Sequence, residues 1–287
     1  MRLLHSSPAI ALPFALIAAL GLTASSAAAD PDPNPDPGAL RLPISEAQRP
    51  ITLPRFVASP AVGFQFDHRA EGTYGELDVT GAFGITDDLM VHALVAPLQL
   101  SSPPGDGGFQ YGETNRNQGP SIGAKYRFVR GEAELAADLT GHVFTLPGYS
   151  SGGSVIPAVL FRLHASPSFR IDLDPAVTFQ LATQSGTGAS ANAVRLDVPL
   201  ALLGNVTEAL DLGLNTGLTI YDVSETRSST GIPLGFFLGY VLRGAHGPAA
   251  DIDPFFNFPY FVMPGRVSPT NTEQYQVGVT VTGYLYL

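Results

Sequence analysis

The sequence contains no cysteine and no tryptophan among its 287 residues, and only 14% of them are charged. Without cysteine there can be no disulfide, no thiol nucleophile and no cysteine-based metal site. Soluble proteins carry about 25% charged residues, so this chain is poor in them. The formal net charge is −10, which argues against nucleic acid as a partner, because phosphate binding requires clustered Lys and Arg. Glycine (31), proline (25) and apolar residues (45%) are abundant, so the chain must bury apolar surface in a core or in lipid.

The N-terminal apolar run, 9–22, is too short to cross a bilayer as a helix, which needs about 20 residues. Arg2 precedes this run, and Ala27–Ala29 follows it with an A-x-A cleavage pattern. These features predict a secretory signal peptide over residues 1–29. No cysteine follows the run, which excludes a lipoprotein anchor.

Residues 30–38 read DPDPNPDPG. Alternating prolines impose an extended, polyproline-like chain that does not pack. The Asp spacing superficially resembles a calcium loop, but the prolines prevent the sharp turn that such a loop requires. We therefore expect a disordered spacer over residues 30–54 and one β domain over residues 55–287.

After Pro54 the apolar residues alternate with polar ones, which indicates β-strands. The clearest segment runs from Phe169 to Leu181, where every odd position is apolar and Arg170, Asp172 and Asp174 lie between them. Similar alternation predicts twelve strands. They are expected at 56–67, 76–85, 89–100, 122–128, 132–143, 155–163, 169–182, 194–202, 210–220, 232–242, 252–262 and 275–287.

The connections between these strands alternate in length. Short ones such as Thr86–Asp88 and Arg130–Gly131 take turns with longer polar ones such as Ser101–Pro120. An even strand number with short turns on one side and long loops on the other is typical of bacterial outer-membrane barrels. The fold class predicted is therefore an all-β, antiparallel, up-and-down transmembrane barrel, whose final strand, Tyr275–Leu287, closes against the first.

A soluble secreted β-domain is the alternative, because sandwich strands also alternate. Sandwich strands average about 5–6 residues, whereas these run about 9–13, near the length that crosses a bilayer with tilt. A one-residue slip of the strand at 169–182 would also place Arg170 and two acids in lipid, at a cost of roughly 2–4 kcal/mol for the Arg alone.

The polar parity of the strands defines candidate pore-lining residues on the inner wall of the barrel. They are Glu76, Asp78, Lys125, Arg127, Glu132, Glu134, Asp138, Arg162, Arg170, Asp172, Asp174, Arg195, Asp197 and Asp211. Lys125 and Arg127 face Glu132 and Glu134 across a tight turn, which suits cross-strand ion pairs. Whether these charges line a solvated channel or pair off in a plugged interior stays open, since twelve strands lie between filled and water-filled barrels.

No catalytic, cofactor or metal site is predicted. Gly148–Gly152 matches G-x-S-x-G, but a strand follows where a nucleophile elbow requires a helix. The histidines show no metal-ligand spacing. We expect a non-enzyme without cofactors.

The stretch Gly84–Leu89, GITDDL, between two strands resembles the periplasmic turn of many Gram-negative outer-membrane barrels. It is similar to turns in porin-like proteins and in transporters of the phenol-degradation meta-pathway type. The resemblance implies a porin-like barrel in the bacterial outer membrane. The leading hypothesis is a channel that passes small solutes by passive diffusion and is gated by the loop Ser101–Pro120. A structural or surface-interaction barrel with a plugged lumen is the alternative. The expected partners are outer-membrane lipid, small solutes and the barrel-assembly machinery, the last through the C-terminal strand.

Overall fold

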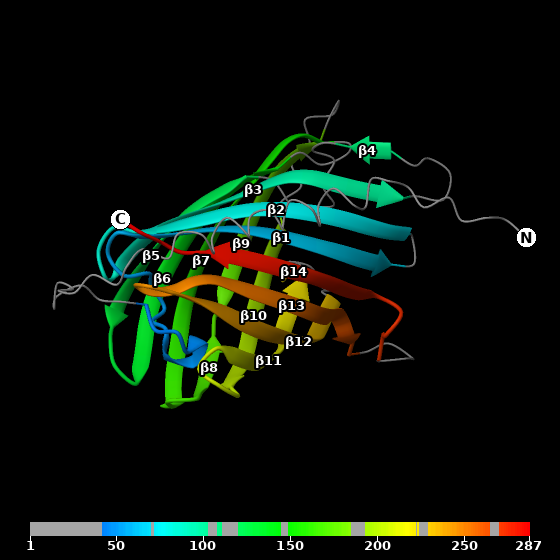
Figure 1. Ribbon diagram of the computed structural model, residues 1–287. Coiled ribbons are helices and arrows are strands. Elements are labelled where there is room, and N and C mark those ends of the chain that lie inside the picture. Colours follow the sequence, from blue (N-terminus) through cyan, green and yellow to red (C-terminus); the bar gives the residue numbers. More distant parts are fainter. Residues whose placement is uncertain are drawn as a thin grey trace, which may run out of the picture.

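The protein forms a closed, antiparallel barrel of twelve strands (Figure 1). The computed structural model describes residues 42–69, 72–102, 108–110, 120–144, 149–184, 193–221, 223, 229–264 and 270–287. Each strand pairs with its neighbour in sequence, and β14 pairs with β1 to close the barrel. This confirms the predicted fold class. Closure pairs the backbone N–H and C=O groups at the edges of the sheet. Lipid requires this pairing because it offers the backbone no hydrogen-bonding partners.

Ten barrel strands are continuous: β1 (Val57–Arg69), β2 (Gly72–Gly84), β3 (Leu89–Ser102), β5 (Ser121–Val129), β6 (Ala133–Phe144), β7 (Tyr149–Ser166), β10 (Ala193–Asn205), β11 (Leu210–Tyr221), β12 (Ser229–Gly244) and β13 (Gly247–Val262). Two are interrupted: β8 (Phe169–Leu173) with β9 (Ala176–Gln184), and β14 (Tyr275–Gly283) with β15 (Leu285–Tyr286). A short strand, β4 (Gly108–Gln110), pairs with β3 outside this series.

The apolar side chains of each alternating strand lie on the outer face of the barrel. On β5, Ile122 is 69% exposed and Phe128 53%, whereas Arg127 between them is buried. Other apolar side chains with large exposed fractions occur around the barrel: Val95, Leu139, Val143, Val159, Leu181, Leu212, Phe236 and Val277. Polar residues thus face inward and apolar residues outward, as predicted, because successive side chains of a strand lie on opposite faces.

Three strand boundaries differ from the prediction. β7 begins at Tyr149, so the strand expected from residue 155 extends back through the Gly/Ser residues before it. The strand expected at 169–182 breaks at Asp174–Pro175, because proline has no N–H to donate to a ladder. β12 and β13 remain paired as far as Gly244 and Gly247, which makes the turn between them shorter than expected.

The predicted signal peptide, the acidic proline repeat and most of the long loops lie outside the described residues. Of the loop Ser101–Pro120, the structure describes 101–102, 108–110 and 120. No helix in the described part of the chain is long and apolar enough to cross a membrane.

Residues 42–54, named here the inner segment, lie within the barrel and contain a single 3-10 turn, η2 (Glu46–Gln48). Leu42, Ala47 and Thr52 are almost fully buried. Ile51 packs on Ala136 and Leu160, two inward residues of β6 and β7. The prediction of a disordered spacer up to residue 54 is therefore wrong for 42–54, because these residues pack against the barrel wall.

Candidate functional site

The lumen is filled on the side of β5 to β8, which we name the filled side. Arg127 of β5 donates from Nη1 to Glu134 of β6 at 2.6 Å and from Nε to Asp88 in the β2–β3 turn at 3.1 Å. The other carboxylate oxygen of Glu134 accepts the backbone N–H of Ile51 at 2.8 Å. Each buried charge therefore has a partner of opposite sign, which lowers the cost of removing it from water.

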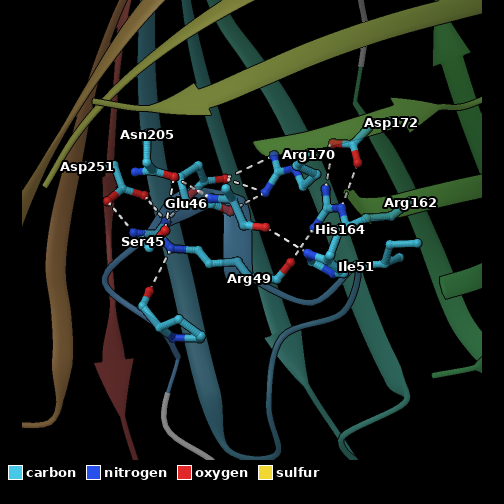
Figure 2. Close-up of polar contacts among 12 residues, drawn as sticks. Ser45, Glu46, Arg49, Ile51, Arg162, His164, Arg170, Asp172, Asn205 and Asp251 are labelled. Atoms are coloured by element: carbon cyan, nitrogen blue, oxygen red, sulfur yellow. Dashed lines mark hydrogen bonds and ion pairs between the residues drawn. The ribbon is translucent and has the colours of Figure 1, made fainter. Parts of the chain in front are cut away.

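The filled side also holds the backbone of the inner segment (Figure 2). Arg162 makes two bonds to Asp172, at 2.7 and 2.9 Å, and a third from Nη1 to the carbonyl of Arg49 at 2.8 Å. His164 donates from Nδ1 to the carbonyl of Ala47 at 2.7 Å. Wall side chains thus satisfy two backbone carbonyls of the inner segment, as burial requires.

Arg49 anchors the inner segment to the opposite wall, as Figure 2 shows. Its guanidinium pairs with Asp251 of β13 through both Nη atoms, and Nη1 also donates to the Tyr284 hydroxyl at 2.8 Å. Burial disfavours the charge, but the carboxylates of Glu46 and Asp251 hold the pKa of Arg49 above its ordinary value. Arg49 thus remains charged and fastens the segment across the lumen.

The inner segment lies at the barrel end that carries the short turns. Thr52 donates to the carbonyl of Asp87, and Gln48 to the carbonyl of Pro167. Ser45 and the Ala47 N–H both bond the side-chain oxygen of Asn205, at 3.0 and 2.8 Å. Contacts to two of the turns and to the end of β10 show that the segment extends across this mouth.

A cavity of about 420 Å³ remains beside the segment, on the wall formed by β10 to β14, which we name the open side. Its lining includes Asp211, Asp251 and Asp253 from the wall and Glu46 from the inner segment, with Arg170 as the basic residue. Phe237, Phe255 and Tyr284 add aromatic surface. The volume lies within the range of pockets that hold small molecules.

The candidate pore-lining residues separate into distinct environments. Arg127 pairs with Glu134, Arg162 with Asp172, and Arg195 with Asp197, while Asp138 bonds His92 at 2.9 Å. Lys125 lies opposite Asp138, and Glu76 accepts a bond from Gln65. Arg170 and Asp211 line the cavity. Asp78 and Asp174 are half-buried.

Glu132 differs from its predicted position, because it lies in the turn before β6 with an exposed side chain. Its expected role in a pair with the basic residues of β5 is taken by Glu134 for Arg127 and by the register partner Asp138 for Lys125.

Sequence reasoning missed four charged residues in and beside the cavity: Glu46, Arg49, Asp251 and Asp253. The two aspartates alternate with Ile252 and lead into Phe255, so extending the period-2 pattern back past Ile252 would have found them. Glu46 and Arg49 carry no such local signal, since their segment shows no alternation.

The described residues contain no cluster of three or more His, Asp or Glu side chains arranged to hold a metal ion. His142 is buried, and its Nδ1 lies 3.3 Å from the Ser154 hydroxyl.

The sequence matches no family model and no curated protein. The fold is similar to that of a solved NanC porin, with a TM-score of 0.53 at 10% identity, over 78% of this chain and all of that one. It is also similar to the COG4313 outer membrane channel from Pseudomonas putida F1, with a TM-score of 0.54 at 12% identity, over 88% of this chain and all of that one. The chain therefore has the barrel fold found in these outer-membrane channels.

Proposed function

We propose that this protein is a porin-like channel of a bacterial outer membrane, which passes small solutes by passive diffusion. The observation that carries this proposal is the 420 Å³ cavity inside a closed barrel with a polar inner wall. The exposed apolar side chains of the outer face suit contact with lipid, where charged residues would be costly.

Export and assembly belong to the same proposal. Residues 1–29 would direct secretion as a cleaved signal peptide. The C-terminal strand would present the barrel to the assembly machinery, and its pairing with β1 is the step that closes the sheet. The loop 101–120 would regulate entry.

A structural barrel with a plugged lumen is the second candidate, and the inner segment favours it. Its contacts with β6, β7, β10, β13 and two turns occupy the short-turn mouth. The two functions differ in one measurable property, which is whether ions cross the lumen.

Conductance in planar bilayers tests the proposal. We expect the purified wild-type protein to conduct, and Arg49→Ala to conduct more, because it removes the bonds to Asp251 and Tyr284 that hold the segment. Arg130→Ala is the control, since this exposed arginine bonds Asp88 at the rim. A barrel that stays sealed in both wild type and Arg49→Ala would support the plugged candidate.

A further inference from the structure

We propose that the open-side cavity is a recognition site for a small organic cation with an apolar body, such as an arylalkyl ammonium. This inference rests on the proposed channel, because a solute reaches the cavity only through the lumen. It names the class of solute that the inner wall selects.

The first reason is the charge balance of the cavity. Four carboxylates line it, from Glu46, Asp211, Asp251 and Asp253, against one guanidinium, that of Arg170. The neighbouring arginines are already engaged: Arg49 pairs with Asp251 and Glu46, and Arg170 with Glu46 and Asp172. The cavity therefore holds more carboxyl groups than the neighbouring guanidinium groups can pair with.

The second reason is the position of Asp211, which is only 2% exposed. Among the described residues, no hydrogen bond or ion pair engages its carboxylate. The carboxylate lies over Gly239 of β12, where an added Cβ would stand 2.4 Å from Oδ1. A buried carboxylate without a partner is costly. A cation that entered the cavity would therefore be stabilised by pairing with this carboxylate.

Asp253 supplies a second such carboxylate, also without a hydrogen bond or ion pair in the described chain. Tyr240 pairs with Ile252, so Gly239 lies opposite Asp253 as well as opposite Asp211. The two acids thus lie on β11 and β13, about 10 Å apart between backbones. Because Gly239 has no side chain, the Asp211 carboxylate lies over it on the side of Asp253, and both acids line the same cavity.

The third reason is the aromatic surface beside the acids. The register aligns Gly213, Phe237, Phe255 and Gly278 across four strands. A Cβ on Gly213 would stand 1.8 Å from the Phe237 ring, and one on Gly278 2.6 Å from the Phe255 ring. Each ring therefore covers a neighbouring glycine, and both rings line the cavity. Such faces suit an apolar group and attract a cation.

Calorimetric titration of the folded protein in detergent tests the site with three probes of one shape: phenethylammonium, 2-phenylethanol and 3-phenylpropionate. We expect the ammonium to bind at least about tenfold more tightly than the alcohol, and the carboxylate more weakly than both. Added salt should weaken the binding of the ammonium and leave that of the alcohol unchanged. Equal affinity for all three probes would overturn the proposal without any variant.

Substitution then locates the site. Asp211→Asn with Asp253→Asn should reduce ammonium affinity to that of the alcohol. Asp197→Asn with Asp138→Asn is the matched control, because it removes the same charge from inward residues that already have partners and do not line the cavity. An equal loss in both double variants would mean that the charge of the whole lumen, rather than this cavity, selects the cation.

Bilayer conductance, measured separately, keeps the two proposals apart. A barrel that conducts but binds no ammonium contradicts the cation site alone. A barrel that binds the ammonium but does not conduct contradicts the channel and leaves the site.

Discussion

The two sides of the lumen solve the problem of inward charges differently. On the filled side, Arg127, Glu134, Arg162 and Asp172 are paired, and the inner segment covers them. On the open side, Asp211 has no such partner and faces a cavity. Paired and hydrogen-bonded charges tolerate dry packing, whereas unpaired ones need water or a ligand. Packing therefore fills the lumen on one side, and the proposed recognition of a solute belongs to the other.

Breaking the filled side should have the largest effect on stability. Arg127→Ala removes the partner of the buried Glu134, so we expect the free energy of unfolding to fall by about 3–5 kcal/mol. Arg195→Ala is the control: its side chain is 37% exposed, so its loss should cost about 1 kcal/mol or less. Urea titration in micelles, followed by circular dichroism, measures both. Equal losses would contradict the contrast drawn between the two arginines.

Loosening the inner segment should come next. Ile51→Ala removes the side chain that packs on Ala136 and Leu160. We expect packing of the inner segment against the wall to weaken by about 2 kcal/mol, which increases its open population about thirtyfold. Because the chain has no cysteine, a single Ser45→Cys reports whether the segment opens. The introduced thiol should react with an aqueous maleimide about thirtyfold faster when Ile51→Ala is added. Unchanged protection would show that the polar anchors alone hold the segment.

Crowding the open side should cost less. Gly213→Ala places a Cβ against the Phe237 ring, and we expect a loss of about 1–2 kcal/mol from overpacking. Gly81→Ala is the matched control, because nothing lies within 4 Å of its added Cβ. Phe237→Leu should reduce the cost of Gly213→Ala in a double-mutant cycle. Additive effects would mean that the ring does not rest on the glycine.

The smallest effect should be a pH dependence at the rim of the filled side. The Arg130 guanidinium, followed by that of Arg127, holds the pKa of Asp88 below its ordinary 3.8, against a partial opposing effect of burial. A lowered folded-state pKa stabilises the fold above pH 3.8, and this contribution disappears as the pH falls further through the folded-state pKa. The stability difference between wild type and Asp88→Asn should therefore shrink between pH 6 and pH 2.5. A difference that stays constant in urea titrations over this range would contradict the assignment.

Most of the barrel could be predicted because its signal is local. Alternation over 169–182 fixes which face of that strand meets lipid, and a one-residue slip would expose Arg170. The same parity placed Asp172, Asp197 and Asp211 inside. The alternation did not predict two strand boundaries. Pro175 splits the strand at 169–182, and the Gly/Ser residues from Tyr149 onward pair in β7 although their composition is typical of a loop.

Pairing in the lumen could not be predicted in the same way. Ile51 meets Glu134, and Arg49 meets Asp251, across separations of 83 and 202 residues. No periodic pattern links such positions, because the contacts form only after the barrel has brought distant strands around the inner segment.

The sequence by itself determined the strands, their inward and outward faces and the excess of acid, since period-2 alternation and composition are properties of neighbouring residues. Only the tertiary structure decided which inward charges are paired, that residues 42–54 enter the lumen, and that Asp211 and Asp253 remain available beside a cavity. These depend on closure, because a closed wall confines charges from distant strands and the inner segment in one small volume, where each must find a partner or face the cavity.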